Sequence, residues 1–259
     1  MSRNQSQSLA IYPDLKGKTV LISGGATGIG RSLVEAYANQ GAKTAFVDID
    51  EGQGKQLESD LLSQGYDVRF TPCDITNQER YQTVINHVSE YFGPIQVLLN
   101  NAANDVRHSL DTITSDSFDD LISVNLKHSL FAAQAVIPMM RKAGGGSIIN
   151  FGSVGWMMAS AGYPVYTASK AATHGLTRGL ARDLGAYSIR VNTLVPGWVM
   201  TEKQLKLWVD DDARNLIRRS QCLKGSLKPH HIAQMALFLG ADASSMCSAQ
   251  NFIVDGGWV

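Results

Sequence analysis

The most informative run of the chain reads KTVLISGGATGIG at residues 18–30, where an apolar segment meets a glycine-rich turn. The apolar part predicts a buried strand, and apolar side chains at helical spacing over residues 28–40 predict a helix directly after the turn. Glycines let a backbone approach a phosphate closely, and a helix N-terminus offers free N–H groups and a positive dipole end. The junction therefore predicts a dinucleotide site, with a turn that binds nothing as the alternative. Its candidate residues are Gly24, Thr27, Gly28, Ile29 and Gly30.

Apolar runs of strand length alternate with segments of helical period along the rest of the chain. Strands are expected at residues 18–23, 43–48, 68–73, 95–100, 146–151, 189–195 and 251–254. Helices are expected at residues 28–40, 52–64, 78–92, in two stretches within 115–140, and at 164–184, 201–224 and 229–240. Short apolar strands separated by helices are typical of a parallel sheet covered on both faces. The sequence thus predicts an α/β fold: one domain, residues 1–259, with a doubly wound (Rossmann) parallel sheet of about seven strands and helices on both faces.

The charge of the chain is balanced, with 23 Lys and Arg residues against 23 Asp and Glu residues. No basic stripe or polybasic segment indicates a nucleic acid or a lipid surface, and no apolar run reaches the ~18 residues of a membrane-spanning helix. The three cysteines and six histidines follow no metal-ligand or disulfide pattern, so no metal site is expected. We expect a cytoplasmic protein whose residues 1–12 form a flexible N-terminal arm.

An acidic residue, Asp48, ends the second expected strand. A carboxylate about 20 residues beyond such a glycine turn can accept both hydroxyls of an adenosine ribose and repels a 2′-phosphate. This favours NAD as the cofactor, with NADP left open; an ordinary turn aspartate is the alternative reading of Asp48. Further cofactor contacts are expected from residues that follow the third and fourth strands, namely Asp74, Ile75 and Asn101.

A second group of reactive residues consists of Tyr166, Lys170 four positions later, and Ser153 upstream. Residues i and i+4 share one face of a helix, so the phenol and the ammonium are expected to lie together. An ammonium favours a phenolate, so Lys170 is expected to lower the pKa of Tyr166. A phenol tuned in this way can move a proton to or from a substrate oxygen. Beside a dinucleotide site, the pair predicts hydride transfer coupled to proton transfer.

Taken in order, these motifs resemble the short-chain dehydrogenase/reductase family over residues 15–259. The matching positions are Gly24-x-x-x-Gly28-x-Gly30, Asp74, Asn100-Asn101-Ala102, Asn125, Ser153, Tyr166-x-x-x-Lys170, Pro196-Gly197 and Thr201. One residue departs from the pattern: Ala103 stands where the family usually has a glycine, which adds a methyl near the cofactor and could shift the loop that follows.

The resemblance implies a role for each matching residue. Tyr166 would be the acid/base, and Lys170 would lower its pKa and hold the nicotinamide ribose. Ser153 would hydrogen-bond the reacting oxygen, and Asn125 would kink its helix and anchor a water that links Lys170 to solvent. The nicotinamide would be lined by Pro196, Gly197, Val199 and Thr201. A satisfied helix asparagine and a strand-end cap are the alternative readings of Asn125 and Ser153.

The family also implies an assembly. Two long expected helices, around residues 117–140 and 164–184, carry small and apolar side chains on several faces. Such helices can bury against a second copy of the chain, and in the family they usually build a tetramer with two-fold symmetry. We therefore expect a homotetramer.

The substrate pocket is expected from residues 104–108, 153–161 and 198–208, with Tyr163. These segments supply polar groups and aromatic rings: Asn104, Asp105, His108, Trp156, Tyr163, Trp198, Lys203 and Gln204. Buried donors and acceptors suit a hydroxyl-rich ligand, and aromatic faces suit the C–H side of a sugar ring. Direct contacts with the sugar are expected from Asn104, Ser153, Trp156, Tyr166 and Trp198.

A narrower resemblance points the same way. The runs AIYPDLKGK (10–18), INFGS (149–153), QCLKG (221–225) and DGGW (255–258), with NDxRH at 104–108, are similar to bacterial sugar 1-dehydrogenases of the family. This implies NAD-dependent oxidation of a small cyclic aldose at C1 to a lactone. Two alternatives stay open: another oxidoreductase of the family, such as a polyol dehydrogenase or a 3-oxoacyl reductase, and a dinucleotide-binding module without catalysis.

Overall fold

The computed structural model describes residues 10–259, and it confirms the predicted parallel sheet. The strand order is β3-β2-β1-β4-β5-β6-β7, and every neighbouring pair is parallel. The strands are β1 (Thr19–Ser23), β2 (Lys43–Asp48), β3 (Val68–Pro72), β4 (Ile95–Asn100), β5 (Gly146–Phe151), β6 (Ile189–Pro196) and β7 (Asn251–Val254). The chain changes its direction of travel across the sheet between β1 and β4, and ligands of such sheets bind outside the carboxyl ends of the strands at this point.

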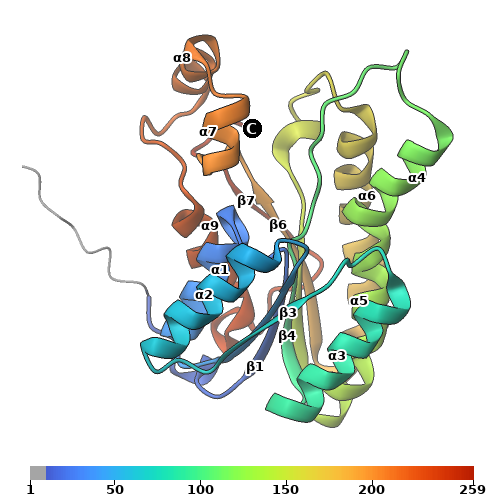
Figure 1. Cartoon of the computed structure of the whole chain (residues 1–259), viewed down its shortest axis with the longest axis vertical. Coiled ribbons are helices and arrows are strands. Elements are labelled where there is room, and N and C mark those ends of the chain that lie inside the picture. The colour runs from blue at the N-terminus through green and yellow to red at the C-terminus, as the bar shows by residue number, and fades with distance from the viewer. Residues whose placement is uncertain (1–9) are drawn as a thin grey trace, which may run out of the picture.

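Helices cover both faces of the sheet. They are α1 (Gly28–Asn39), α2 (Glu51–Ser63), α3 (Gln78–Phe92), α4 (Ser115–Ile122), α5 (His128–Lys142), α6 (Pro164–Leu184), α7 (Glu202–Leu207), α8 (Asp211–Ser220) and α9 (Pro229–Gly240). In Figure 1, α1, α2 and α9 lie on one side of the sheet and α3, α5 and α6 on the other. The two stretches predicted within residues 115–140 are α4 and α5, joined by a π-helical turn at Ser123–Lys127. The excursion predicted at residues 201–224 consists of α7 and α8.

Each face of the sheet has its own apolar core. Successive side chains of a strand point to opposite faces, so Val20 and Ile22 join the core beneath α1 and α9, whereas Leu21 joins the core beneath α3 and α5. All five residues of β1 are buried. Burial on both faces explains why the strand reads as a continuous apolar run rather than an alternating one.

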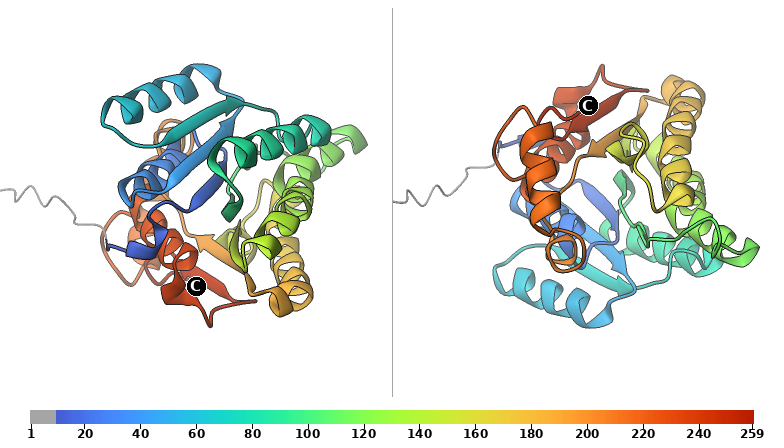
Figure 2. Two further views of the ribbon diagram at one scale, coloured as in Figure 1. Left: turned by 90° about the horizontal axis from the view of Figure 1, so that it is seen from below. Right: turned by 90° about the horizontal axis from the view of Figure 1, so that it is seen from above.

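Two segments extend beyond the carboxyl ends of the strands and build the walls of the site. The first is the loop at residues 101–114 between β4 and α4, and the second runs from the end of β6 through α7 and α8. Seen from above in Figure 2, α7 and α8 lie on the opposite side of the sheet's upper edge from α4 and α6. A ligand at the switch point would therefore meet both segments.

Residues 1–9 of the expected N-terminal arm lie outside the described part of the chain. Residues 10–12 are held against the body of the protein: Tyr12 N donates to Gln40 Oε1 at 2.8 Å, and Gln40 Nε2 donates to Ala10 O at 2.9 Å. The arm predicted over residues 1–12 therefore does not extend to residues 10–12.

Three further properties concern membranes, metals and thiols. None of the helices within residues 10–259 is both long and apolar enough to cross a membrane. The same residues contain no group of three or more His, Cys, Asp or Glu side chains placed to hold a metal ion. The thiols of Cys73, Cys222 and Cys247 are free.

Candidate active site

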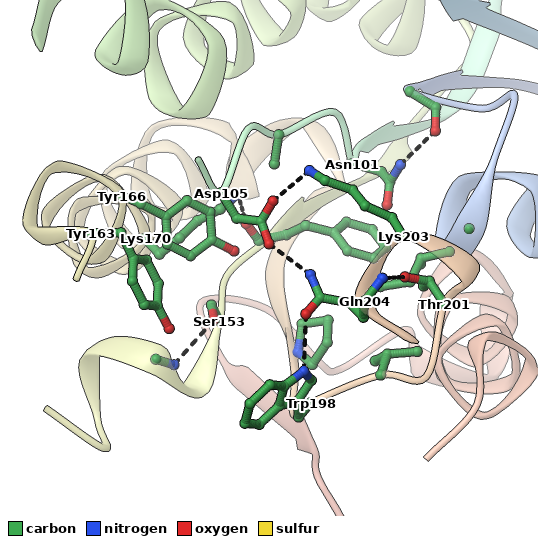
Figure 3. A pocket seen from close by; sticks show the side chains of 18 of the residues that line it. Asn101, Asp105, Ser153, Tyr163, Tyr166, Lys170, Trp198, Thr201, Lys203 and Gln204 are labelled. Carbon is green, nitrogen blue, oxygen red and sulfur yellow. Dashed lines mark hydrogen bonds and ion pairs between the residues drawn. The ribbon is translucent and has the colours of Figure 1, made fainter. Parts of the chain in front are cut away.

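A cleft of about 1560 Å³ lies at the carboxyl ends of the strands. It is larger than the ~300–1000 Å³ of a usual small-molecule pocket, as a dinucleotide and a substrate together require. Most of the predicted site residues line it: Gly24, Thr27, Gly28, Ile29, Gly30, Asp48, Asp74, Ile75, Asn101, Ser153, Tyr166, Lys170, Pro196, Gly197, Trp198, Val199 and Thr201. Figure 3 shows how the side chains from the β4–α4 loop, α6 and α7 converge at one end of the cleft.

The glycine turn is so tight that its backbone leaves no room for side chains at two positions. A Cβ atom on Gly30 would lie 1.7 Å from the carbonyl oxygen of Gly24, and one on Gly24 would lie 2.8 Å from the Cα atom of Ala102. Gly24 and Gly28 also have positive φ angles, which favour glycine. Asn101 fixes the turn, since its Nδ2 donates to the carbonyl oxygens of Ser23 and Gly24 at 3.0 and 2.9 Å. The bare N-terminus of α1 thus faces the cleft, as a pyrophosphate would need.

Asp48 is placed beside this turn by the end of β2. One carboxylate oxygen accepts from Ala26 N at 2.9 Å, and the other accepts from Asp50 N at 3.1 Å. The next residue, Ile49, lines the cleft with 77% of its surface exposed, an apolar edge suited to a flat base. Asp74 lies across the same end, although its Oδ1 already accepts from the backbone and the hydroxyl of Thr76. These residues line the end of the cleft where the adenosine of a dinucleotide was predicted.

The residues predicted around a nicotinamide follow the end of β6. Gly197 is held to β7 by a hydrogen bond from its N–H to Val254 O at 2.9 Å, and a Cβ there would lie 2.6 Å from the Cβ of Asp255. Thr201 begins α7 as its N-cap, and its hydroxyl accepts from Gln204 N at 3.2 Å. The departure at Ala103 causes no strain, because Ala103 is not among the residues with a positive φ angle.

The reactive group predicted from the sequence lies together on one wall of the cleft. Lys170 is 2% exposed; its ammonium donates to Phe151 O at 2.8 Å and lies 5.7 Å from the centre of the Tyr166 ring. Ser153, at the end of β5, accepts from Gly155 N at 3.1 Å. The rings of Tyr163 and Tyr166 lie 5.2 Å apart, centre to centre. Tyr166 and Lys170, one helical turn apart on α6, therefore lie close to Ser153, which follows β5 by two residues.

The electrostatics of this group differ from the prediction. Burial raises the pKa of the Tyr166 phenol well above its ordinary value, and the nearby Ser153 hydroxyl offsets only part of that rise. Burial also destabilises the ammonium of Lys170 and lowers its pKa to about 8. The Asp105 carboxylate acts in the opposite direction, to raise the pKa of Lys170. The predicted lowering of the Tyr166 pKa by Lys170 is therefore wrong for this structure, since desolvation of the phenol is the dominant cause and raises its pKa.

The buried ammonium of Lys170 makes the stability of the protein depend on pH. Its pKa falls from the ordinary lysine value of 10.5 in the unfolded chain to about 8 in the folded chain, so between these values the unfolded chain binds more protons and stability rises with pH. We expect the unfolding free energy of the wild type, relative to that of Lys170→Met, to rise by up to about 3 kcal/mol between pH 8 and pH 10.5. Urea titration of both proteins measures this difference. A difference that stays constant over this window would contradict the lowered pKa.

Asn125 is buried within the π-helical turn rather than in the wall of the cleft. Its side chain pairs with the backbone of Asn104: Oδ1 accepts from Asn104 N at 2.9 Å, and Nδ2 donates to Asn104 O at 3.0 Å. The widened turn agrees with the kink implied for this helix. Because both polar atoms of the side chain are used, its visible effect is to fix the start of the β4–α4 loop.

Two of the predicted sugar contacts point elsewhere. Asn104 does not line the cleft, and its Oδ1 accepts from Val106 N at 3.1 Å within its own loop. Trp156 also lies outside the lining; its indole donates to His174 Nε2 at 3.3 Å and packs edge-on against that ring. In this structure both side chains stabilise loops and are not part of the cleft lining. Trp198 does line the cleft, with its Nε1 donating to Gln204 Oε1 at 2.9 Å.

Several lining residues were absent from the predicted contacts. Asp105 and Lys203 form an ion pair of 2.6 Å across the cleft, and both had been expected only as part of the pocket segments. Four more lining side chains fall in the expected pocket segments but were not proposed as contacts: Arg107, Met157, Met158 and Trp208. Leu216, Trp258 and Val259 also line the cleft and lie outside those segments. Trp258 and Val259 follow the last strand, where no periodicity indicates the direction of a side chain. Arg107 and Trp258 each had a signal in the sequence, their places in the NDxRH and DGGW runs.

Comparisons with known proteins agree with this geometry. The family model described as enoyl-(acyl carrier protein) reductase matches residues 24–259. The D-xylose 1-dehydrogenase of Caulobacter vibrioides is 42% identical over 251 residues, which cover 97% of this chain and 99% of that one. The "Probable galactose dehydrogenase" of Rhizobium meliloti is 40% identical over 95% of this chain and 96% of its own length.

Among solved structures, a gluconate 5-dehydrogenase from Burkholderia cenocepacia in complex with NADP and tartrate matches with a TM-score of 0.88 at 29% identity. The match covers 95% of this chain and 97% of that chain. A nearly full-length family match, close relatives that are dehydrogenases, and a cleft that joins a glycine turn to Tyr166 and Lys170 lead to one conclusion. The chain belongs to the short-chain dehydrogenase/reductase family of oxidoreductases.

Proposed function

We propose that the protein catalyses the NAD-dependent oxidation of a cyclic aldose at C1 to the aldonolactone. The observation that carries the proposal is one continuous cleft, lined at one end by the glycine turn and Asp48 and at the other by Ser153, Tyr166 and Lys170. The two sugar dehydrogenases among the relatives support an aldose as the substrate.

The residues at the reacting end of the cleft have separate catalytic roles. When bound along Gly24–Gly30 and Asp48, NAD supplies the acceptor for the hydride that leaves C1. Tyr166 takes the proton of the C1 hydroxyl, so that the C1–O bond becomes the carbonyl of the lactone. Ser153 accepts a backbone hydrogen bond, which leaves its hydroxyl hydrogen free to donate to the C1 oxygen. Since burial raises the pKa of Tyr166, we expect turnover to increase with rising pH.

Lys170 and Asn125 act behind Tyr166. The Lys170 ammonium, which donates to Phe151 O, would also hold the ribose next to the nicotinamide. Asn125, in the π-helical turn, would anchor the water that links Lys170 to solvent. Preference for NAD over NADP rests on the Asp48 carboxylate, which would repel a 2′-phosphate.

A turnover screen tests the proposal directly. We expect near-ultraviolet absorbance of NADH to appear with pentoses or hexoses and NAD, more slowly with NADP, and the product to be a lactone by NMR. Polyols, secondary alcohols and 3-oxoacyl thioesters (the last with the reduced cofactors) belong in the same screen, because another oxidoreductase activity of the family is the alternative. No turnover of any aldose, together with clean turnover of one of these compounds, would overturn the proposal.

A homotetramer is part of the proposal. On α6, Gly175 and Gly179 lie one turn apart and exposed, and a Cβ on either would meet nothing within 4 Å. Glycine in a helix interior lowers stability, and it is useful there where another element packs closely against the helix. We propose that this element is α6 of a second copy of the chain. Phe118 and Leu130, on α4 and α5, add exposed apolar surface. Light scattering that gives the mass of a single chain would contradict this assembly.

A further inference from the structure

A short loop segment, Asp105-Val106-Arg107, presents two charged side chains to the substrate end of the cleft. Asp105 and Arg107 both line the cleft, whereas Val106 between them is 48% exposed and outside its lining. This alternation is that of an extended chain, in which residues i and i+2 point to the same side. The segment therefore places a hydrogen-bond acceptor and a donor side by side.

Asp105 is held in the cleft by residues of α7. One oxygen accepts from Lys203 Nζ at 2.6 Å and the other from Gln204 Nε2 at 2.7 Å. Burial alone would raise the pKa of Asp105, but the Lys203 ammonium and the Gln204 amide lower it below its ordinary value, so the group is a carboxylate. A carboxylate offers about four acceptor positions, of which these bonds use two. The Asp105 carboxylate acts on the pKa of the Tyr166 phenol by its charge, and Figure 3 shows both side chains at the same end of the cleft, so its free positions are close to the reacting end.

Arg107 is held in a different way, by aromatic rings. Its guanidinium carbon lies 3.7 Å from the centre of the Tyr163 ring and 5.1 Å from that of the Trp208 ring. Stacking covers the faces of the guanidinium, while its N–H groups project from the edge. No carboxylate within residues 10–259 forms an ion pair with it. A fixed cation with free donors in a ligand cleft is suited to oxygen atoms of the ligand.

We propose that Asp105 and Arg107 are specificity-determining residues that bind ring hydroxyls of the sugar. The inference rests on the proposed function and goes beyond it, because it names the groups that distinguish a polyhydroxylated ring from an apolar alcohol. Asp105 accepts from a hydroxyl hydrogen, and Arg107 donates to a hydroxyl oxygen. A site built to hydrogen-bond hydroxyls rejects a substrate that lacks them, because its own polar groups are then left unpaired.

The test compares two cyclic hemiacetals that undergo the same reaction. D-xylose has ring hydroxyls, whereas tetrahydropyran-2-ol has only the hydroxyl that is oxidised. A hydrogen bond to a charged group contributes about 1.5–3 kcal/mol, or roughly 10–150-fold in kcat/KM. We expect Asp105→Asn and Arg107→Met each to lower kcat/KM for D-xylose by about that factor, and kcat/KM for tetrahydropyran-2-ol by less than about threefold.

Two further variants separate binding from structural effects. Asp111→Asn removes an exposed carboxylate later in the same loop and should change neither substrate's kcat/KM. Lys203→Met breaks the ion pair but keeps the Asp105 carboxylate, so its loss for D-xylose should be clearly smaller than that of Asp105→Asn. Equal losses in these two variants would overturn the inference, because Asp105 would then act only by holding α7.

Two other outcomes are decisive. If the wild type oxidises aldoses but the Asp105 and Arg107 variants lose activity equally on both hemiacetals, the specificity role is wrong while the proposed function stands. If a uronic acid is oxidised better than D-xylose and Arg107→Met abolishes that advantage, Arg107 binds a carboxylate and the inference also fails. Absence of turnover with every aldose would instead overturn the proposed function.

Discussion

Tyr166→Phe is expected to lower kcat by about 100–10,000-fold while NAD binding changes little. The substitution removes one oxygen atom and keeps the ring that packs 5.2 Å from Tyr163, so the cleft should retain its shape. General acid–base catalysis contributes about 10²–10⁴-fold in enzymes, which sets the size of the effect. Turnover is followed by NADH absorbance, and NAD binding by calorimetry on the same preparation.

The neighbouring tyrosine provides a matched control. Tyr163→Phe removes the same atom one helical turn away, and its ring also lines the cleft. We expect Tyr163→Phe to change kcat by a few-fold at most, because Tyr163 contributes packing and takes no part in proton transfer. Turnover that survives in Tyr166→Phe, or collapses equally in Tyr163→Phe, would show that Tyr166 is not the acid/base.

Asp48→Asn is expected to reverse or abolish the discrimination between NAD and NADP. Two like charges about 4 Å apart in a partly solvated site repel by about 4 kcal/mol, which corresponds to roughly 10³-fold. The ratio of kcat/KM for NAD to that for NADP should fall by about this factor. Asparagine keeps an oxygen that can accept from Ala26 N, so the turn itself should survive.

Asp50→Asn is the control for this change. Asp50 caps α2 by accepting from Gln53 N at 3.0 Å, and asparagine caps a helix equally well. It removes an exposed charge two residues away from Asp48 without touching the cleft lining. Its cofactor ratio should stay within about threefold of the wild type. A preference unchanged in Asp48→Asn would assign the discrimination to another residue.

The sequence predicted those parts of the protein that local patterns determine. The strands read as apolar runs because both faces of the sheet are buried, and Tyr166 and Lys170 meet because one helix fixes their spacing. The glycine turn was equally readable, since no side chain fits at Gly24 or Gly30.

The substrate end was less predictable for physical reasons. Asn104 and Trp156 belong to irregular segments with no period to fix the direction of a side chain, and local partners turned both away from the cleft. The stack of Arg107 on Trp208 joins two segments far apart in the chain. The pKa of Tyr166 depends on how much protein surrounds it, which spacing alone does not give.

The short helix α7 has a consequence for anyone who redesigns this protein. Its N-cap is Thr201, which is predicted to lie beside the nicotinamide, and its C-cap is Trp208, whose ring faces Arg107. The six residues of α7 form fewer than two helical turns, so we expect substitutions in α7 aimed at new sugars to shift Thr201 and alter coenzyme affinity as well. Met157, Met158 and Trp258 line the cleft from other segments, so we expect that randomising them would change substrate preference with less effect on coenzyme affinity.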